Sequence, residues 1–123
     1  MNQFPQPKIL VVDDDEVLCQ LLCEQLHDDK FITEYVLNGF DAMKKIKNEN
    51  YNLVTTNLNM PGMNGDQLLT EIKIYDSSIP VIMLTAQDDP ATIIKCIELG
   101  ADDYLTKPYE YEELLSSVKK YIN

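Results

Sequence analysis

Short apolar runs alternate with longer segments whose apolar residues recur at helical spacing. The short runs lack a helical period and are rich in aliphatic and β-branched residues, as in Ile9–Val12. A continuous apolar run of this kind is typical of a strand buried on both faces of a parallel sheet. The runs that predict strands are 9–12, 32–36, 53–56, 81–85 and 103–106.

The segments between these runs carry apolar stripes that predict helices. Pro90 suits a first helical turn, and Gly100 suits the end of the same helix. The stripes are Leu18, Leu21, Leu22 and Leu26; Phe40, Met43 and Ile46; Leu68, Leu69 and Ile72; Ile93, Ile94 and Ile97; and Leu114, Leu115 and Val118. Strict strand–helix alternation predicts an α/β fold, a doubly wound five-strand parallel sheet with helices on both faces. We find no linker or repeat and expect one domain over residues 1–123.

The composition narrows the possible partners. The net charge is −11 and the pI about 4.3, so the surface repels nucleic acid and anionic membranes, and we expect neither as a partner. No apolar run approaches membrane-span length, and residues 1–4 lack a signal-peptide pattern. The number and spacing of the three cysteines are not typical of a disulfide framework. We therefore expect a cytoplasmic protein.

Polar residues follow the predicted strands where they end. Asp13 and Asp14 follow the first strand, Asn57 the third, Thr85 closes the fourth, and Lys107 follows the fifth. Ligands of open α/β sheets bind in the crevice at these carboxyl ends. The acidic run at 13–16 fits either helix capping or a bound divalent cation such as Mg²⁺, and spacing alone does not decide between them.

Four blocks resemble the receiver domains of bacterial two-component response regulators. They are Ile9–Asp15, Asn59–Gly65, Leu84–Ala86 and Gly100–Pro108, in the family's order, and the resemblance runs from about Lys8 to the C-terminus. It implies the flavodoxin-like (βα)5 receiver fold. It also implies a phosphorelay in which a sensor histidine kinase or phosphotransfer protein phosphorylates a strand-3 aspartate, with Mg²⁺ bound alongside.

The resemblance also implies roles for individual residues. Asp13 and Asp14 correspond to the acidic pair that holds Mg²⁺, and Asn59 would add its backbone carbonyl. Thr85 and Lys107 correspond to the residues that hold the phosphoryl oxygens.

The output surface is expected on the fourth helix, fifth strand and fifth helix, where a downstream protein would bind. Tyr104 corresponds to the switch aromatic of this face, and Tyr109 and Tyr111 are expected in or beside it. Regulators that dimerise through this face carry a basic residue where Ser117 stands, so that dimer is not expected. We expect either a single-domain regulator or the receiver part of a longer protein.

The sequence departs from the family at Asn57, which stands where the phosphoacceptor aspartate belongs. An amide oxygen is neutral and lacks the negative charge that makes a carboxylate nucleophilic. We therefore predict a receiver that is not phosphorylated at this position and acts through protein–protein interaction. Mg²⁺ binding should be weakened, although the amide oxygen of residue 57 could still coordinate. Asn57 is either native or an engineered Asp→Asn change.

Three other interpretations fit the sequence less well. A haloacid-dehalogenase-type phosphatase would use Asp13 and Asp15, but it leaves the block after Asn57 unexplained. A flavodoxin would need a hydroxyl- and glycine-rich loop where this chain is acidic. Cys19, Cys23 and His27 have i, i+4 spacing and suit zinc, but a fourth ligand is not evident. We expect a signalling protein, not an enzyme.

Overall fold

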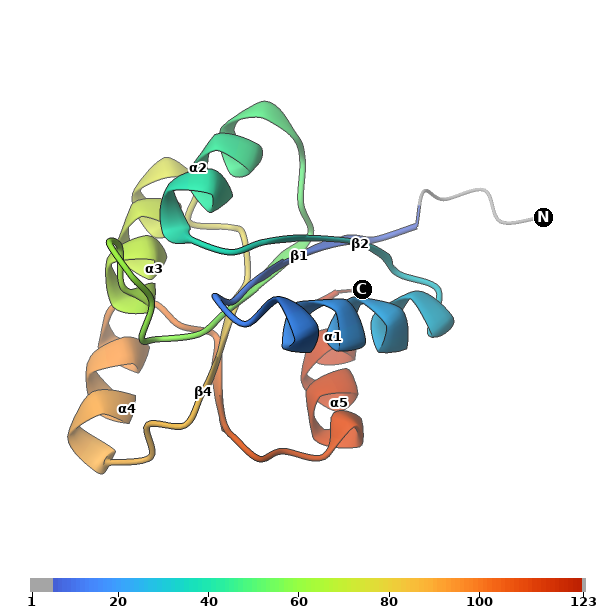
Figure 1. Ribbon diagram of the computed structural model, residues 1–123. Coiled ribbons are helices and arrows are strands. Elements are labelled where there is room, and N and C mark those ends of the chain that lie inside the picture. The colour runs from blue at the N-terminus through green and yellow to red at the C-terminus, as the bar shows by residue number, and fades with distance from the viewer. Residues whose placement is uncertain (1–5, 123) are drawn as a thin grey trace.

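The computed structural model describes residues 6–122 and alternates strands with helices (Figure 1). The strands are β1 (Lys8–Val12), β2 (Ile32–Val36), β3 (Leu53–Thr56), β4 (Val81–Thr85) and β5 (Asp103–Thr106). The helices are α1 (Glu16–Asp28), α2 (Gly39–Asn48), α3 (Gly65–Tyr75), α4 (Pro90–Glu98) and α5 (Tyr111–Tyr121). The predicted elements are confirmed, while residues 1–5 and 123 of the expected domain lie outside the described part. No helix within residues 6–122 is long and apolar enough to cross a membrane.

The strands form one parallel sheet in the order β2-β1-β3-β4-β5, which confirms the doubly wound α/β prediction. Val12 of β1 lies beside Thr56 of β3, and Thr85 of β4 lies beside Thr106 of β5. The carboxyl ends of these strands therefore meet along one edge. This register brings the segments that follow them into one region.

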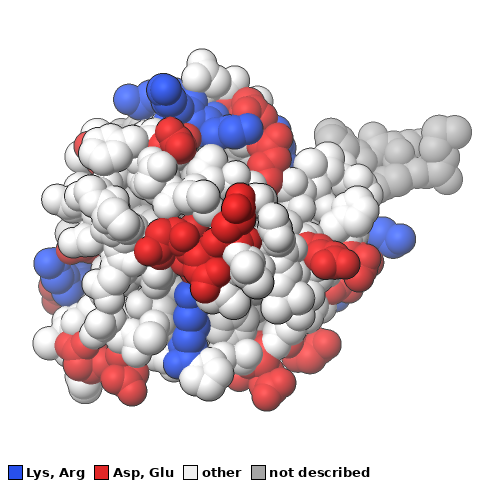
Figure 2. Space-filling model, in the orientation of Figure 1, with Lys and Arg blue, Asp and Glu red and all other residues white. Residues whose placement is uncertain are grey.

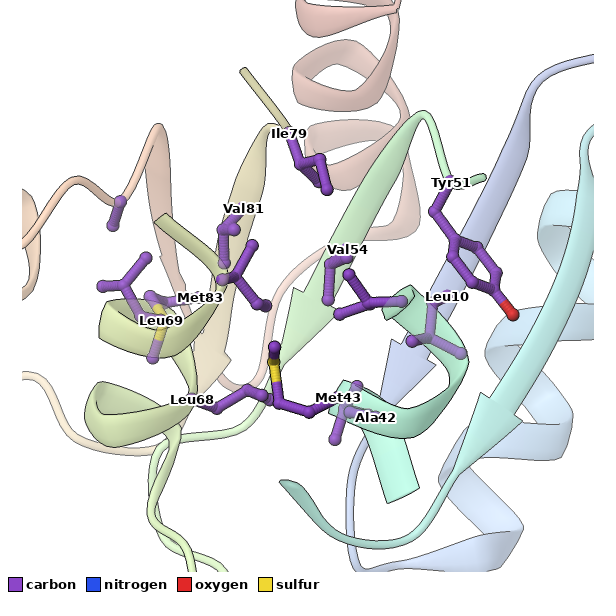
Figure 3. Close-up of a cluster of buried hydrophobic side chains, with 14 of the residues drawn as sticks. Leu10, Ala42, Met43, Tyr51, Val54, Leu68, Leu69, Ile79, Val81 and Met83 are labelled. Atoms are coloured by element: carbon purple, nitrogen blue, oxygen red, sulfur yellow. The ribbon is translucent and has the colours of Figure 1, made fainter. Parts of the chain in front are cut away.

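The two faces of the sheet have separate hydrophobic clusters. Leu10, Val54 and Met83 belong to the cluster beneath α2 and α3 (Figure 3). Ile9, Leu53 and Leu84 belong to the cluster on the other face, which α1 and α5 cover. Successive strand residues point to opposite faces, so a strand with both faces covered is apolar throughout. This explains the continuous runs of the sequence.

The helical stripes are buried only in part. In α1 the residues against the sheet are Cys19, Leu22 and Leu26, whereas Leu18 and Leu21 are exposed. A helix packs on a sheet along a narrow line, and residues one position away point about 100° to the side. For the same reason Phe40 of α2 is exposed, and in α4 Cys96 is buried while Ile94 and Ile97 are not.

Two helices begin with the same Asn-Gly pair, but their glycines have different surroundings. A Cβ built on Gly65 would lie 2.1 Å from the Asn57 carbonyl oxygen, and this contact is with backbone. A Cβ on Gly39 would meet the Met63 side chain, with Sδ at 2.7 Å. The backbone cannot yield, whereas a methionine side chain can turn aside.

We therefore expect Gly65→Ala to lower the free energy of unfolding by about 3 kcal/mol, because the added methyl group must displace the backbone after β3. Gly39→Ala is the matched control, at the first position of α2, and should cost less than about 1 kcal/mol. Urea denaturation of both variants measures the difference. Equal losses would show that the close approach of α3 to residue 57 does not constrain the fold.

Candidate functional site

Asp13, Asn57 and Lys107 line the same cavity at the carboxyl edge of the sheet. Backbone hydrogen bonds extend the sheet into the segments that carry them. The amide of Asn57 donates to the Val12 carbonyl (3.0 Å), and the amide of Lys107 donates to the Thr85 carbonyl (2.9 Å). The fold thus brings together three of the predicted site residues. The Lys107–Pro108 peptide bond is cis.

The ammonium of Lys107 pairs with the carboxylate of Asp13. Lys107 Nζ donates to Asp13 Oδ2 at 2.8 Å, and Asp13 is only 8% exposed. The second oxygen of Asp13, Oδ1, accepts from the Asp15 amide at 3.0 Å. Figure 2 shows acidic side chains gathered at the centre of one face, with basic atoms directly below them.

The neighbouring acids have different surroundings. Asp15 is the N-cap of α1, and its carboxylate accepts from the Leu18 amide. Asp14 is exposed and forms no hydrogen bond or ion pair with the residues that the structure describes. Helix capping therefore explains Asp15, whereas it does not explain Asp14.

Asn57 uses both ends of its side-chain amide. Its Oδ1 accepts from the Leu58 amide at 3.0 Å, and its Nδ2 donates to the Asn59 carbonyl at 3.1 Å. This carbonyl is the one expected to bind the metal. A carboxylate at position 57 could not donate this hydrogen bond. The Asn57 amide therefore hydrogen-bonds to the oxygen that was expected to bind the cation.

The oxygen donors of the predicted metal site are of the kind that Mg²⁺ prefers: two carboxylates, an amide oxygen and a backbone carbonyl. Asp13, Asp14, Asn57 and Asn59 therefore fit the ion in type. Two of these groups are already engaged, by Lys107 and by the Asn57 amide. No cluster of three His, Cys, Asp or Glu side chains suited to a metal occurs between residues 6 and 122.

Thr85 lies beside this cavity but does not line it. The residue is 1% exposed, and its hydroxyl accepts from the Gln87 amide at 3.3 Å. Tyr104 also contacts Gln87: the Tyr104 hydroxyl donates to the Gln87 carbonyl at 2.7 Å. Burial raises the pKa of the Tyr104 phenol to about 12, so the group stays protonated and able to donate. Gln87 thus connects two predicted switch residues, a link that sequence spacing did not reveal.

Two residues on the face of the sheet that α1 covers lie at the site, although the sequence did not place them there. The buried thiol of Cys19 lies 3.3 Å from the Asp13 carbonyl, and burial, with Asp13 nearby, raises its pKa to about 12. Thr55 also lines the cavity. A hydroxyl residue within a strand buried on both faces was the available signal.

The tyrosines expected near the output surface divide between two faces. Tyr104 packs against the α2–α3 cluster, whereas Tyr109 and Tyr111 pack against the α1–α5 cluster. The Tyr111 hydroxyl lies 2.7 Å from Asp29 Oδ2, next to α1. Ser117 is buried, and its hydroxyl donates to the Asp103 carboxylate.

The chain is similar to proteins of one family. The model of the response regulator receiver domain matches residues 9–119. The CpxR homolog of Haemophilus influenzae, a transcriptional regulatory protein, is 42% identical over 91% of this chain and 48% of its own length. MtrA of Mycobacterium tuberculosis, a DNA-binding response regulator, is 37% identical over 91% and 49%. The chain spans about half the length of these curated relatives.

The fold is also that of solved receivers. The response regulator TrrA of Thermotoga maritima, in complex with Mg²⁺ and BeF, superposes with a TM-score of 0.87, 32% identity and coverage of 95% of this chain and 100% of that one. A CheY-like receiver domain protein of Methanospirillum hungatei superposes with a TM-score of 0.91, 27% identity and coverage of 94% and 93%. The phosphatase alternative with Asp13 and Asp15 is wrong, since these proteins are signalling proteins and Asp15 caps α1.

We expect Lys107→Met to lower the free energy of unfolding by about 2 kcal/mol, because it leaves the nearly buried Asp13 carboxylate without its cation. Asp13→Asn should cost less, since it also removes a charge from the acidic cluster. A double-mutant cycle with urea denaturation should give a coupling of about 1–2 kcal/mol. Additive single-variant losses would show that the two charges do not stabilise one another.

Proposed function

Because the chain belongs to the response regulator receiver family, we propose that it is a receiver with a disabled phosphoacceptor, acting by protein–protein interaction. The observation that carries this proposal is the bonding of Asn57. Its amide is neutral, and both of its polar atoms are engaged within the loop that follows β3. An amide oxygen in this state is a poor nucleophile towards phosphorus.

The pairing of Lys107 supports the same proposal. A lysine that holds a phosphoryl group must be able to reach the acceptor position. Here its ammonium lies 2.8 Å from Asp13 Oδ2. With a neutral residue at position 57, Asp13 is the anion that Lys107 pairs with. We assign Lys107 and Thr85 the phosphoryl-binding role of the family, which this chain retains but does not use.

We assign the metal site to Asp13, Asp14, the side chain of Asn57 and the carbonyl of Asn59. Receivers typically bind Mg²⁺. When bound, the ion supplies positive charge that offsets the negative charge of the phosphoryl group. In this chain the ion must compete with Lys107 for Asp13 and with the Asn57 amide for the Asn59 carbonyl. Position 57 also contributes no negative charge. The two competing interactions and the missing negative charge each weaken Mg²⁺ binding.

We assign the output surface to α4, β5 and α5. Ile94 and Ile97 are exposed on α4, and exposed apolar side chains favour a protein partner. Tyr104 would be the switch of this surface, coupled to Thr85 through Gln87. The hydrogen bond of Ser117 to Asp103 argues against a dimer that needs a basic residue there.

The upstream partner of a response regulator is a histidine kinase. For this chain we propose a sensor histidine kinase or phosphotransfer protein that docks on the unphosphorylated domain. The free thiols of Cys19, Cys23 and Cys96 favour a cytoplasmic location. The net charge of −11 argues against nucleic acid or anionic membrane as a partner of this domain.

Restoring the carboxylate tests the proposal. We expect Asn57→Asp to become phosphorylated by a small acyl phosphate with Mg²⁺, giving an acid-stable, base-labile adduct seen by intact-mass spectrometry. The chain as it stands should remain unlabelled. Asn59→Asp is the control, because it adds the same carboxylate two residues away, and it should also remain unlabelled. Labelling of the unaltered chain would overturn the proposal.

Mg²⁺ affinity provides a second test. We expect Asn57→Asp to bind Mg²⁺ at least about tenfold more tightly, since it adds a negative ligand and frees the Asn59 carbonyl. Asn48→Asp adds the same charge on the exposed side of α2 and should leave the affinity within about twofold. Isothermal titration calorimetry at fixed ionic strength measures both. Equal affinities for the unaltered chain and Asn57→Asp would contradict the weakened site.

A further inference from the structure

A groove of about 450 Å³ runs between α2 and α3, which lie side by side on one face of the sheet (Figure 1). Two large apolar side chains line it although they are open to solvent: Phe40 is 60% exposed and Ile74 is 81% exposed. The Phe40 ring packs over Gly62, where an added Cβ would lie 3.1 Å from its Cε2 atom. Exposed apolar side chains gathered in one groove favour contact with another protein surface.

The charged residues beside this groove include both signs. Lys44 and Lys47 follow Phe40 at positions i+4 and i+7, so they share its side of α2. Glu71 of α3 lines the groove, one helical turn before Ile74. Lys44, Lys47 and Glu71 are exposed and form no ion pair with any residue between 6 and 122. A surface of this kind can be complementary to a second copy of itself.

The exposed apolar side chains of α1 and α4 have different surroundings. Val17 and Leu21 lie on α1, which contains no lysine and begins within the acidic run 13–16. Two copies of that helix would repel one another. The single lysine of α4, Lys95, already pairs with Asp66 at 3.2 Å. In a chain with a net charge of −11, the groove between α2 and α3 therefore suits self-association better than either of these helices.

We propose that the groove between α2 and α3 is the interface of a symmetric dimer of this domain. Lys44 and Lys47 disfavour a basic partner and Glu71 disfavours an acidic one, whereas a second copy supplies both complementary charges. The dimer is a property of the resting domain and goes beyond the disabled phosphoacceptor.

The direction of the helices determines which residues meet. Both helices connect parallel strands, so they run in the same direction. A twofold axis along the groove then places α2 of one copy over α3 of the other, and every contact occurs twice. Lys44 and Glu71 lie near the middle of their helices, so each Lys44 is opposite Glu71 of the other copy. Phe40 meets its counterpart at one end of the groove, and Ile74 meets its counterpart at the other.

A dilution series tests for self-association. Sedimentation equilibrium at physiological ionic strength, where charge repulsion is largely screened beyond about 8 Å, should show a dimer fraction that rises with chain concentration up to about 1 mM. In ¹⁵N NMR spectra over the same range, the amides of α2 and α3 should shift with concentration. The amides of α1 and α4 should not shift.

An apolar-to-charged substitution tests the location. Ile74 is so exposed that Ile74→Asp should leave the fold intact, and it should weaken the dimer at least about tenfold because it brings two carboxylates together near the axis. Ile94→Asp is the matched control, since Ile94 is also exposed, at 56%, but lies on α4. It should leave the dimer within about twofold.

Two charge reversals test the pairing. Lys44→Glu and Glu71→Lys change the net charge of the chain in opposite directions. Each should nevertheless weaken the dimer at least about fivefold, because each places like charges opposite one another in both halves of the interface. The double variant restores opposite charges and should dimerise within about twofold of the unaltered chain. An effect of net charge alone would instead strengthen the dimer in Glu71→Lys.

Three results would overturn the proposal: a monomer throughout the dilution series, a dimer that Ile74→Asp weakens no more than Ile94→Asp, or a double reversal that binds no more tightly than the single reversals. None of these variants alters position 57. The results therefore do not depend on whether Asn57 accepts a phosphoryl group.

Discussion

The ion pair between Lys107 and Asp13 is the contact on which the arrangement of the site depends. It joins residues 94 positions apart and connects the segment after β5 to the end of β1. Asp14, Asp15 and Glu16 follow Asp13 directly, so the ammonium offsets repulsion where the acids are most crowded. In a domain with a net charge of −11, this partly buried cation stabilises the acidic carboxyl edge of the sheet.

Asn57 changes which groups pair with one another. An aspartate there would add another anion beside Asp13 and compete for Lys107. The amide competes for neither charge and donates instead to the Asn59 carbonyl. The groups around position 57 are therefore held by interactions within the domain: the ion pair of Lys107 with Asp13 and the hydrogen bond of Asn57 to the Asn59 carbonyl.

The strands were predictable from sequence because a parallel sheet buried on both faces requires continuous apolar runs, such as Ile9–Val12. The convergence of Asp13, Asn57 and Lys107 was also predictable, because the carboxyl ends of parallel strands share one edge. The exposure of Leu21 was not, since an apolar residue fits the helical stripe whether it faces the sheet or a cavity. The link from Thr85 to Tyr104 through Gln87 was also not predictable from the sequence, because it depends on the backbone conformation of a loop.

The close approach of Gly65 to Asn57 has a mechanical meaning. The Gly65 amide donates to the Leu58 carbonyl at 2.6 Å, and no side chain separates the start of α3 from the end of β3. A shift of the main chain at position 57 would therefore move the start of α3 directly. Only backbone atoms form this connection, so exchanging the side chain of residue 57 does not remove it.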